Sequence, residues 1–120
     1  MKTLISILFA MMIAGCGKSL TEEEKIRDSI GGEYELKDED GDTYKLVFLD
    51  NYLYESYLNG KMQLEVKWKI TNGEIHVDSS VFIQIFRPNK DKSITEIAWI
   101  EDGKRTDYLK EEQWTFKRIK

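Results

Sequence analysis

The feature that most constrains the fold is a nine-residue segment, residues 62–70, in which apolar and polar side chains alternate at every position. A period of two is typical of a β-strand that buries one face and exposes the other. Similar but less regular patterns predict further strands at residues 34–37, 44–49, 52–58, 74–78, 81–87, 93–100, 105–109 and 113–119. We therefore expect an all-β domain of about eight or nine strands.

Short turn signals separate these strands. Asn-Gly and Asp-Gly pairs readily take the positive φ that tight hairpin turns require. Connections this short join antiparallel neighbours, because parallel strands need a long crossover. The pattern predicts an up-and-down meander that closes into a barrel and so removes its exposed edges. The turn signals are Asp40-Gly41, Asp50-Asn51, Asn59-Gly60, Asn72-Gly73, Pro88-Asn89 and Asp102-Gly103.

One short helix is predicted ahead of the strands, at residues 21–30. Thr21 and Glu24 have the spacing of a capping box, in which each side chain binds the backbone N–H of the other residue. Ile26 and Ile30 give the helix one apolar face, and Gly31-Gly32 is expected to end it. The barrel domain should then occupy residues 31–120.

Residues 1–15 have the composition of a secretory signal peptide. Lys2 supplies the positive start, and an apolar stretch from Leu4 to Ala14 follows, interrupted only by Ser6. This stretch is too short to span a bilayer core, which needs roughly twenty residues. We expect it to be cleaved.

The end of that segment, Ile13-Ala14-Gly15-Cys16, resembles the bacterial lipobox. The resemblance implies that signal peptidase recognises Ile13, Ala14 and Gly15, and that Cys16 becomes a lipidated N-terminus carrying acyl chains such as palmitate. Residues 16–20 would then form the tether, and Gly17, in place of an Asp, weakly favours the outer membrane. An ordinary cleavage site with an incidental cysteine, or a buried helix of a cytosolic protein, are the alternatives. The first leaves an unpaired thiol in an oxidising compartment, and the second gives a helix with no polar face.

Composition excludes several classes of protein. The chain has 120 residues, enough for one domain, and a single Cys and a single His. One cysteine excludes an internal disulfide and a Cys-based zinc site. Once residues 1–15 are removed, 17 basic and 22 acidic side chains remain, a net charge of −5. We therefore expect no nucleic-acid partner, no metal and no cofactor, and a monomer held at the membrane by lipid alone.

Several segments resemble small bacterial lipocalin-like lipoproteins. The segment Gly32-Glu33-Tyr34-Glu35-Leu36 looks like the Gly-x-Trp start of lipocalins, with Tyr34 in place of Trp. The segments at residues 44–48, 59–60, 68–75 and 113–118 are similar to the body and closing strand of the same family. The resemblance implies an eight-stranded barrel in which Arg118 stacks on Tyr34, as an Arg stacks on the first-strand Trp of lipocalins.

The barrel interior could be filled or hollow, since eight strands permit both. A domain this small needs bulky groups to build its core, which favours a filled interior over a true cavity. A small groove at one open end is a further alternative. Residues expected to contact a ligand or the rim are Tyr54, Trp68 and Trp99. Those expected to point inward are Phe48, Tyr54, Leu64, Val66, Trp68, Ile83, Ile85, Ile97, Trp99, Trp114 and Phe116.

Other chemistry-bearing residues have plainer interpretations. Residues 38–42 are rich in Asp but lack the spacing of an EF-hand loop, so we expect a charged hairpin tip. His76 lies in a short strand opposite two aliphatic residues, so we expect it to face solvent. Tyr57, out of phase with Tyr52 and Tyr54, is the tyrosine to test for exposure. The carboxylate pairs flank turns, and no nucleophile motif is present, so catalysis is not expected.

The sequence as a whole predicts a non-catalytic, lipid-anchored protein of the bacterial cell envelope that carries a small β-barrel binding or interaction module. One alternative is a lipocalin-like carrier of a small apolar ligand. Another is an envelope protein-inhibitor or stress sensor that contacts other proteins through a barrel edge or rim.

Overall fold

The computed structural model describes residues 21–120. The predicted signal peptide, the lipobox with Cys16 and the tether lie outside the described residues. The described part begins with one α-helix, α2 (Glu22–Ile30). Strands follow in the order β2 (Gly32–Lys37), β3 (Thr43–Phe48), β4 (Leu53–Leu58), β5 (Lys61–Thr71), β6 (Glu74–Asp78), β7 (Ile83–Pro88), β8 (Ile94–Glu101), β9 (Lys104–Asp107) and, after the short 3-10 turn η2 (Lys110–Glu112), β10 (Trp114–Arg118).

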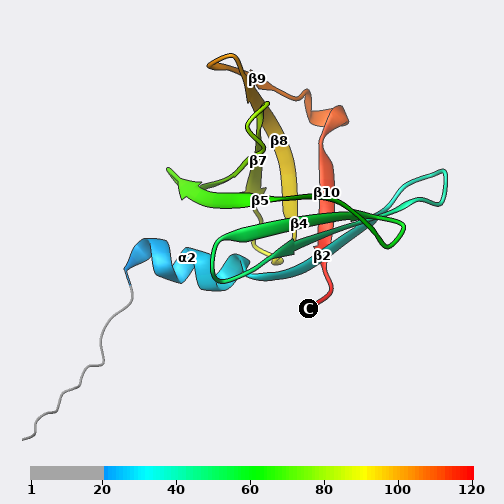
Figure 1. The fold of residues 1–120 in the computed structure, drawn as a ribbon, viewed down its shortest axis with the longest axis horizontal. Helices are drawn as coiled ribbons and strands as arrows, with labels where there is room; N and C mark the ends of the chain where they lie inside the picture. Colours follow the sequence, from blue (N-terminus) through cyan, green and yellow to red (C-terminus); the bar gives the residue numbers. More distant parts are fainter. Residues whose placement is uncertain (1–20) are drawn as a thin grey trace, which may run out of the picture.

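The strands form one antiparallel sheet that closes on itself. Consecutive strands from β2 to β9 are neighbours, and β10 pairs with β2 on one side and β8 on the other. Eight strands thus make a closed barrel, and β9 extends β8 as one extra strand. The predicted all-β barrel preceded by a short helix is confirmed (Figure 1). No helix among the described residues is long and apolar enough to cross a membrane.

The predicted hairpin turns form where the sequence places them. Asn59 and Gly60 have φ of 51° and 84°. The corresponding angles are 52° and 80° at Asn72-Gly73, and 53° and 74° at Asp102-Gly103. Two successive positive φ angles define the turn that matches the twist of antiparallel strands. These turns hold β4 to β5, β5 to β6, and β8 to β9.

The capping box of α2 is present as predicted. The backbone N–H of Glu24 donates to the Thr21 hydroxyl at 3.0 Å, and the Glu24 carboxylate accepts from the Thr21 N–H at 2.9 Å. Ile30 is buried and Ile26 packs beside it on the barrel core. The helix therefore covers one end of the barrel, opposite the tip of the β2–β3 hairpin (Figure 1).

Gly32 and Arg118 join the first strand of the barrel to the last. Gly32 has φ of +145°, and a Cβ there would lie 2.3 Å from the Lys120 carbonyl oxygen and 2.9 Å from the Arg118 guanidinium. The guanidinium lies over the Tyr34 ring at 5.8 Å and donates to the Ser29 carbonyl at 2.7 Å. The expected pairing of Arg118 with Tyr34 is confirmed. It also ties β10 to the end of α2.

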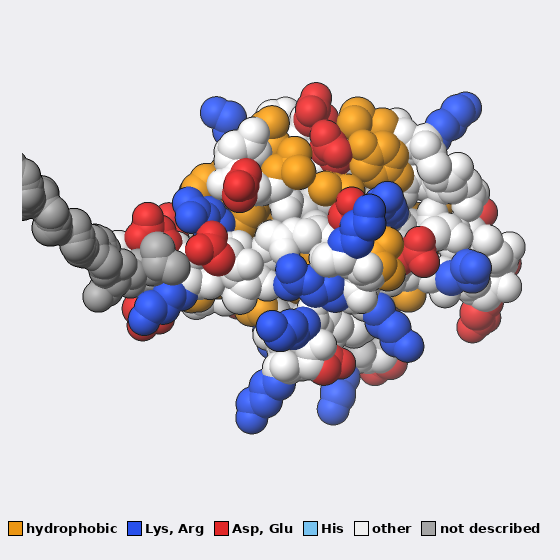
Figure 2. All heavy atoms as spheres, turned by 90° about the horizontal axis from the view of Figure 1, so that it is seen from below, with side chains coloured by type: hydrophobic (Ala, Val, Ile, Leu, Met, Phe, Trp, Pro, Cys, Tyr) orange, Lys and Arg blue, Asp and Glu red, His pale blue; other side chains and the backbone are white. Residues whose placement is uncertain are grey.

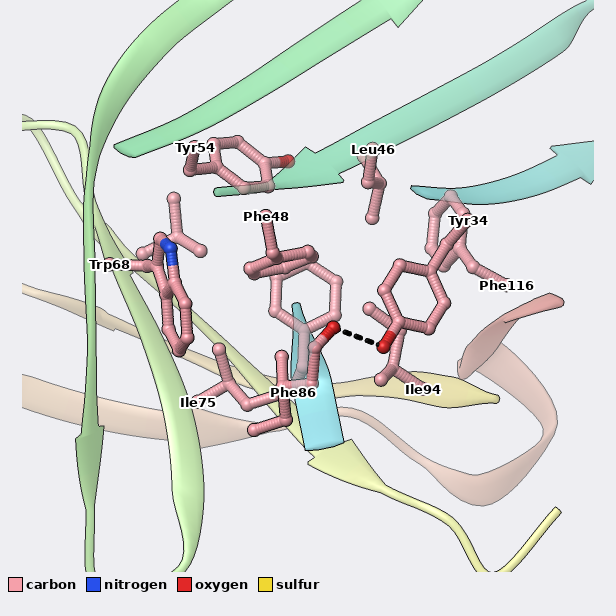
Figure 3. Packing of buried hydrophobic residues seen from close by; sticks show 11 residues of the cluster. Tyr34, Leu46, Phe48, Tyr54, Trp68, Ile75, Phe86, Ile94 and Phe116 are labelled. Carbon is pink, nitrogen blue, oxygen red and sulfur yellow. Dashed lines mark hydrogen bonds between the residues drawn. The ribbon is translucent and has the colours of Figure 1, made fainter. Parts of the chain in front are cut away.

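The core is concentrated at the end of the barrel that α2 covers. Phe48 lies at its centre and makes edge contacts with the rings of four other aromatic residues (Figure 3). Tyr34 donates its hydroxyl proton to the Ile30 carbonyl, so its polar end is satisfied inside the core. The buried cluster consists of Ile30, Tyr34, Leu46, Phe48, Tyr54, Trp68, Ile75, Val77, Phe86, Ile94 and Phe116.

Two β-bulges change which side chains point into the barrel. The pairing of β7 with β8 skips Ile97, and the pairing of β4 with β5 skips Gln63. An extra residue on one strand shifts the phase of its alternation.

On β7, Phe86 belongs to the core cluster, so Ile83 and Ile85 point to the opposite face of the strand, contrary to prediction. Met62, the first residue of the alternating segment, pairs with Tyr57 and is exposed. Of the remaining predicted residues, Phe48, Tyr54, Trp68 and Phe116 are buried core residues, and Leu64 and Val66 are partly buried against that core. Trp114 shares the face of Phe116 but is exposed near the start of β10. Trp99 pairs with Gln84 and so lies on the inward face as predicted, whereas Ile97 is the bulged residue and has no partner on β7.

Candidate ligand-binding site

A cavity of about 410 Å³ occupies the end of the barrel opposite α2. Its walls come from β3, β4 and β5 on one side and from β7, β8 and β10 on the other, so it lies within the barrel and opens at the rim. The barrel is therefore filled at one end and hollow at the other. This matches the alternative of a groove at one open end rather than an interior filled throughout.

The core forms the floor of the cavity. Leu46, Tyr54 and Phe116 belong to the buried cluster and also line the cavity, so packing of the closed end fixes their positions. Leu46 is the cross-strand partner of Ser56, and Ser56 in turn pairs with Leu64. These three side chains form one continuous wall across β3, β4 and β5.

Aromatic side chains surround the mouth of the cavity. Tyr44 and Trp114 contact each other edge to face with ring centroids 5.3 Å apart, and Phe82 lines the opposite side. Trp114 and Phe82 are 44% and 38% exposed. Contiguous exposed apolar patches often mark the binding site of a ligand or a partner. The rim is thus apolar where a solvent-facing rim would ordinarily be polar.

Glu96 is the charged residue in the wall of the main cavity. Its Oε2 accepts hydrogen bonds from the Gln84 amide and the Tyr108 hydroxyl, each at 3.3 Å. Burial raises the pKa of Glu96 above its ordinary value, and the two hydrogen bonds only oppose that rise. Burial together with the Glu96 charge raises the pKa of Tyr108 to about 12. Tyr54, on the floor, also has a pKa raised by burial.

A smaller hollow of about 210 Å³ adjoins the main cavity and shares Glu96 and Trp114 with it. Tyr108 and Glu112 complete its lining. It lies where β8 changes partner: residues 98–101 of β8 pair with β9, whereas residues 94–96 pair with β10. The change of partner exposes the Glu96 side chain to both spaces.

The three residues predicted to contact a ligand have different positions. Tyr54 lies on the cavity floor. Trp68 is 2% exposed and donates its Nε1 proton to the Leu49 carbonyl at 3.1 Å, so it is a core residue. Trp99 packs on Tyr108 with ring centroids 4.8 Å apart and lines a shallow hollow beside Phe82. The structure does not bring these three together in one site.

Sequence reasoning missed Glu96, the main polar residue of the cavity. With Ile97 and Trp99 assigned inward, strict alternation places Glu96 outward. The bulge at Ile97 changes this: Glu96 pairs with Phe86 and Trp99 pairs with Gln84. Because Gln84 and Phe86 lie on one face of β7, Glu96 faces inward together with Trp99. Nothing local in the segment signals a bulge.

His76 is buried, which corrects the prediction that it faces solvent. Its side chain lies on the outer face of β6 between Lys69 of β5 and Ile85 of β7. Arg105 in the β8–β9 hairpin donates to both oxygens of Glu74, at 2.9 and 3.1 Å, and this pair helps to cover the histidine. Burial lowers the pKa of His76, although Glu74 opposes the change. The imidazole is thus outside the barrel, away from the cavity.

Residues 38–42 form the turn between β2 and β3, as predicted for a hairpin tip. The Asp38 carboxylate accepts from the backbone N–H groups of Asp40 and Asp42, at 3.0 and 2.9 Å. Within residues 21–120, no group of three or more His, Cys, Asp or Glu side chains is placed to hold a metal ion. Tyr57 is half-buried and donates to Glu55 at 2.8 Å.

One face of the molecule carries mixed charge. Figure 2 shows Lys and Arg side chains interspersed with Asp and Glu over the face it presents, with hydrophobic groups between them.

The fold and the cavity together define a small closed β-barrel with a ligand-sized hollow at one end. Comparisons of the chain with models of protein families, with curated proteins and with solved structures gave no match.

Proposed function

We propose that this protein is a non-catalytic binding protein that holds a small, largely apolar ligand in the open end of its barrel. The observation that carries the proposal is the cavity of about 410 Å³. Ligand sites typically measure about 300–1,000 Å³ and combine apolar walls with a few convergent polar groups. The cavity has both features, because Leu46, Leu64 and Phe116 line it together with Gln84 and Glu96.

The chemistry of the cavity favours binding over catalysis. Glu96 has a raised pKa, which is a common property of catalytic acids. Hydrolysis with two carboxylates, or nucleophilic attack, would need a second catalytic group facing it. Its hydrogen-bond partners are an amide and a phenol, and His76 lies on the outer face of the barrel. Glu112, the other carboxylate of the adjoining hollow, is exposed and accepts from the Leu109 backbone N–H.

We further propose that the protein is anchored in the bacterial cell envelope through acyl chains on Cys16. Support comes from the sequence Ile13-Ala14-Gly15-Cys16 at the end of an apolar leader. Two or three acyl chains hold a protein firmly, since each buried methylene contributes about 0.8 kcal/mol. Mass spectrometry of the mature protein should find a lipidated Cys16 at the N-terminus. An unmodified Cys16, or a retained Met1, would contradict the anchor without bearing on the cavity.

Binding is tested with decanol, a neutral compound with one apolar chain, at concentrations below aggregation, by isothermal titration calorimetry. Ser56→Trp places a large ring in the cavity, because Ser56 lies on its wall between Leu46 and Leu64. Glu65→Trp is the matched control, since Glu65 is exposed on the outer face of the neighbouring strand. Both variants are checked by circular dichroism, and Leu58→Trp replaces Ser56→Trp if the latter does not fold.

We expect the native protein and Glu65→Trp to bind decanol with equal affinity, and Ser56→Trp to lose at least about tenfold, or roughly 1.4 kcal/mol. Equal affinity in the native protein and in folded Ser56→Trp would place binding elsewhere. No binding to the native protein would contradict the proposal and favour the alternative in which the barrel contacts another envelope protein.

A further inference from the structure

We propose that the cavity selects a small organic cation: a protonated amine carried on an apolar body, with the ammonium group at Glu96. This inference rests on the proposed function and names the chemical class of its ligand. It is carried by three features of the open end, namely the charge of its lining, the partners of Glu96, and the aromatic rings around that carboxylate.

The lining of the open end carries negative charge and no positive charge. Glu96 faces the main cavity and the adjoining hollow, and Glu112 lines the second. Among the described residues that line these two spaces, none is Lys or Arg. The lining differs in this from the rest of the chain, because 18 of its 120 residues are Lys or Arg. On the face shown in Figure 2, basic and acidic side chains are interspersed. An anionic ligand would be repelled here, whereas a cation would be attracted.

Glu96 has hydrogen-bond partners but no counterion. Gln84 and Tyr108 donate to it, and both are neutral. None of the salt bridges formed by residues 21–120 involves Glu96. A carboxylate removed from water is costly unless a charge compensates it. The hydrogen bonds use Oε2, which leaves Oε1 available to accept an N–H of a bound ammonium group.

Aromatic rings lie beside this carboxylate. Trp114 is the direct cross-strand partner of Glu96, and Tyr44 packs against Trp114. Tyr108, which donates to Glu96, packs against Trp99 with the two ring planes inclined at 46°. A cation over the face of Trp or Tyr is attracted by the ring, by about 0.5–2 kcal/mol according to its exposure. A carboxylate flanked by Trp and Tyr therefore attracts an ammonium group in two ways.

The apolar wall supplies the second half of the selectivity. Leu46, Leu64 and Phe116 line the same cavity as Glu96. A ligand with its ammonium group at Glu96 can therefore lay an alkyl or aryl body on these residues. A small hydrated metal ion could bind the carboxylate but would not contact these apolar residues. The apolar wall therefore favours an amine that carries an apolar body.

The test uses decylamine, decanol and decanoate, which share one chain and differ in their head group, with calorimetry on the native protein at neutral pH. The key variant is Glu96→Gln, which keeps the size of the side chain and removes its charge. Glu65→Gln is the matched control, because it removes one charge from the exposed outer face. All three proteins are first compared by circular dichroism.

We expect decylamine to bind the native protein at least about tenfold more tightly than decanol, and decanoate to bind least. Glu96→Gln should remove that preference, whereas Glu65→Gln should preserve it. Decanol binding with no preference for the amine, or a preference that survives in Glu96→Gln, would overturn this inference and leave the proposed function intact. Absence of binding by all three compounds would contradict both.

Discussion

The two ends of this barrel are built from the same strands but differ in how their interior is packed. At the end covered by α2, Phe48 contacts four aromatic rings with centroids 5.1–6.1 Å away, and the interior is filled. At the other end, strands β3, β4 and β10 continue around a cavity of about 410 Å³. The difference shows how a small domain can keep a hollow: it concentrates its core in one half of the barrel.

The change from core to cavity occurs within single strands. On β3, Phe48 is 1% exposed, and Tyr44, four residues earlier on the same face, lines the mouth of the cavity. On β10, Phe116 is a core residue, whereas Trp114, two residues earlier, is 44% exposed. The closed end therefore supplies the stability that lets the open end remain hollow.

The largest expected effect is the loss of Phe48. Phe48→Ala should lower the free energy of unfolding by about 3–5 kcal/mol, because it removes a buried ring and leaves a cavity at the centre of the core. Trp114→Ala, the counterpart at the open end, should cost less than about 1 kcal/mol, since that ring is partly exposed already. Urea unfolding followed by circular dichroism measures both. Equal losses would mean that the two ends contribute equally to stability.

A smaller but still substantial effect is expected at Gly32, where the strands of the closed end meet. Gly32→Ala should cost about 2 kcal/mol, because the residue has positive φ and its Cβ would meet the Lys120 carbonyl oxygen at 2.3 Å. Gly60→Ala, in the β4–β5 hairpin at the open end, has positive φ but no atom within 4 Å of the added Cβ. The difference between the two variants isolates the steric contact. Equal losses in Gly60→Ala and Gly32→Ala would show that the contact with the Lys120 carbonyl adds nothing to the cost of the positive φ.

A pH-dependent effect is expected from Glu96 at the open end. Its folded pKa is raised above 4.5, so the folded state holds the proton more strongly than the unfolded chain does. As the pH rises from about 4.5 through that raised pKa, the native protein should lose stability. Glu96→Gln should lack this loss and become relatively more stable toward neutral pH. Denaturant unfolding of both proteins across pH 4–8 measures the change. If the free energies of unfolding of the two proteins vary with pH in parallel, the ionisation of Glu96 does not destabilise the fold.

The smallest effect is expected at His76, on the outer wall between the two ends. Burial lowers its pKa below 6.5, so the unfolded chain binds a proton more readily, and stability should fall as the pH decreases from 6.5 through the lowered pKa. Because the chain has one histidine, its imidazole signal in an NMR titration is unambiguous. A midpoint at or above 6.5 would show that the β8–β9 hairpin leaves His76 accessible to water.

Much of the architecture follows from local patterns. The period of two, the Asn-Gly and Asp-Gly turns and the Thr21–Glu24 capping box each specify one element, and the structure has each of them. The expected Arg118–Tyr34 contact also forms, because the closure of the barrel brings its first and last strands together.

The site was less predictable because it depends on non-local features. Glu96 faces the cavity only because β8 carries a bulge at Ile97, and one extra residue reverses the face of every side chain beyond it. His76 is covered by an ion pair between Glu74 and Arg105, thirty-one residues apart. The hollow itself arises because the large side chains gather at one end, which composition does not reveal.

A methyl NMR titration with decanol distinguishes a barrel that is filled at one end and hollow at the other from one that is uniform along its length. We expect the methyl signals of Leu46, Leu58 and Leu64, which line the cavity, to shift progressively and saturate. The signals of Ile75 and Val77, in the closed core, should remain in place. Shifts of equal size at both ends, or no shift at Leu46, Leu58 and Leu64, would contradict this difference between the two ends.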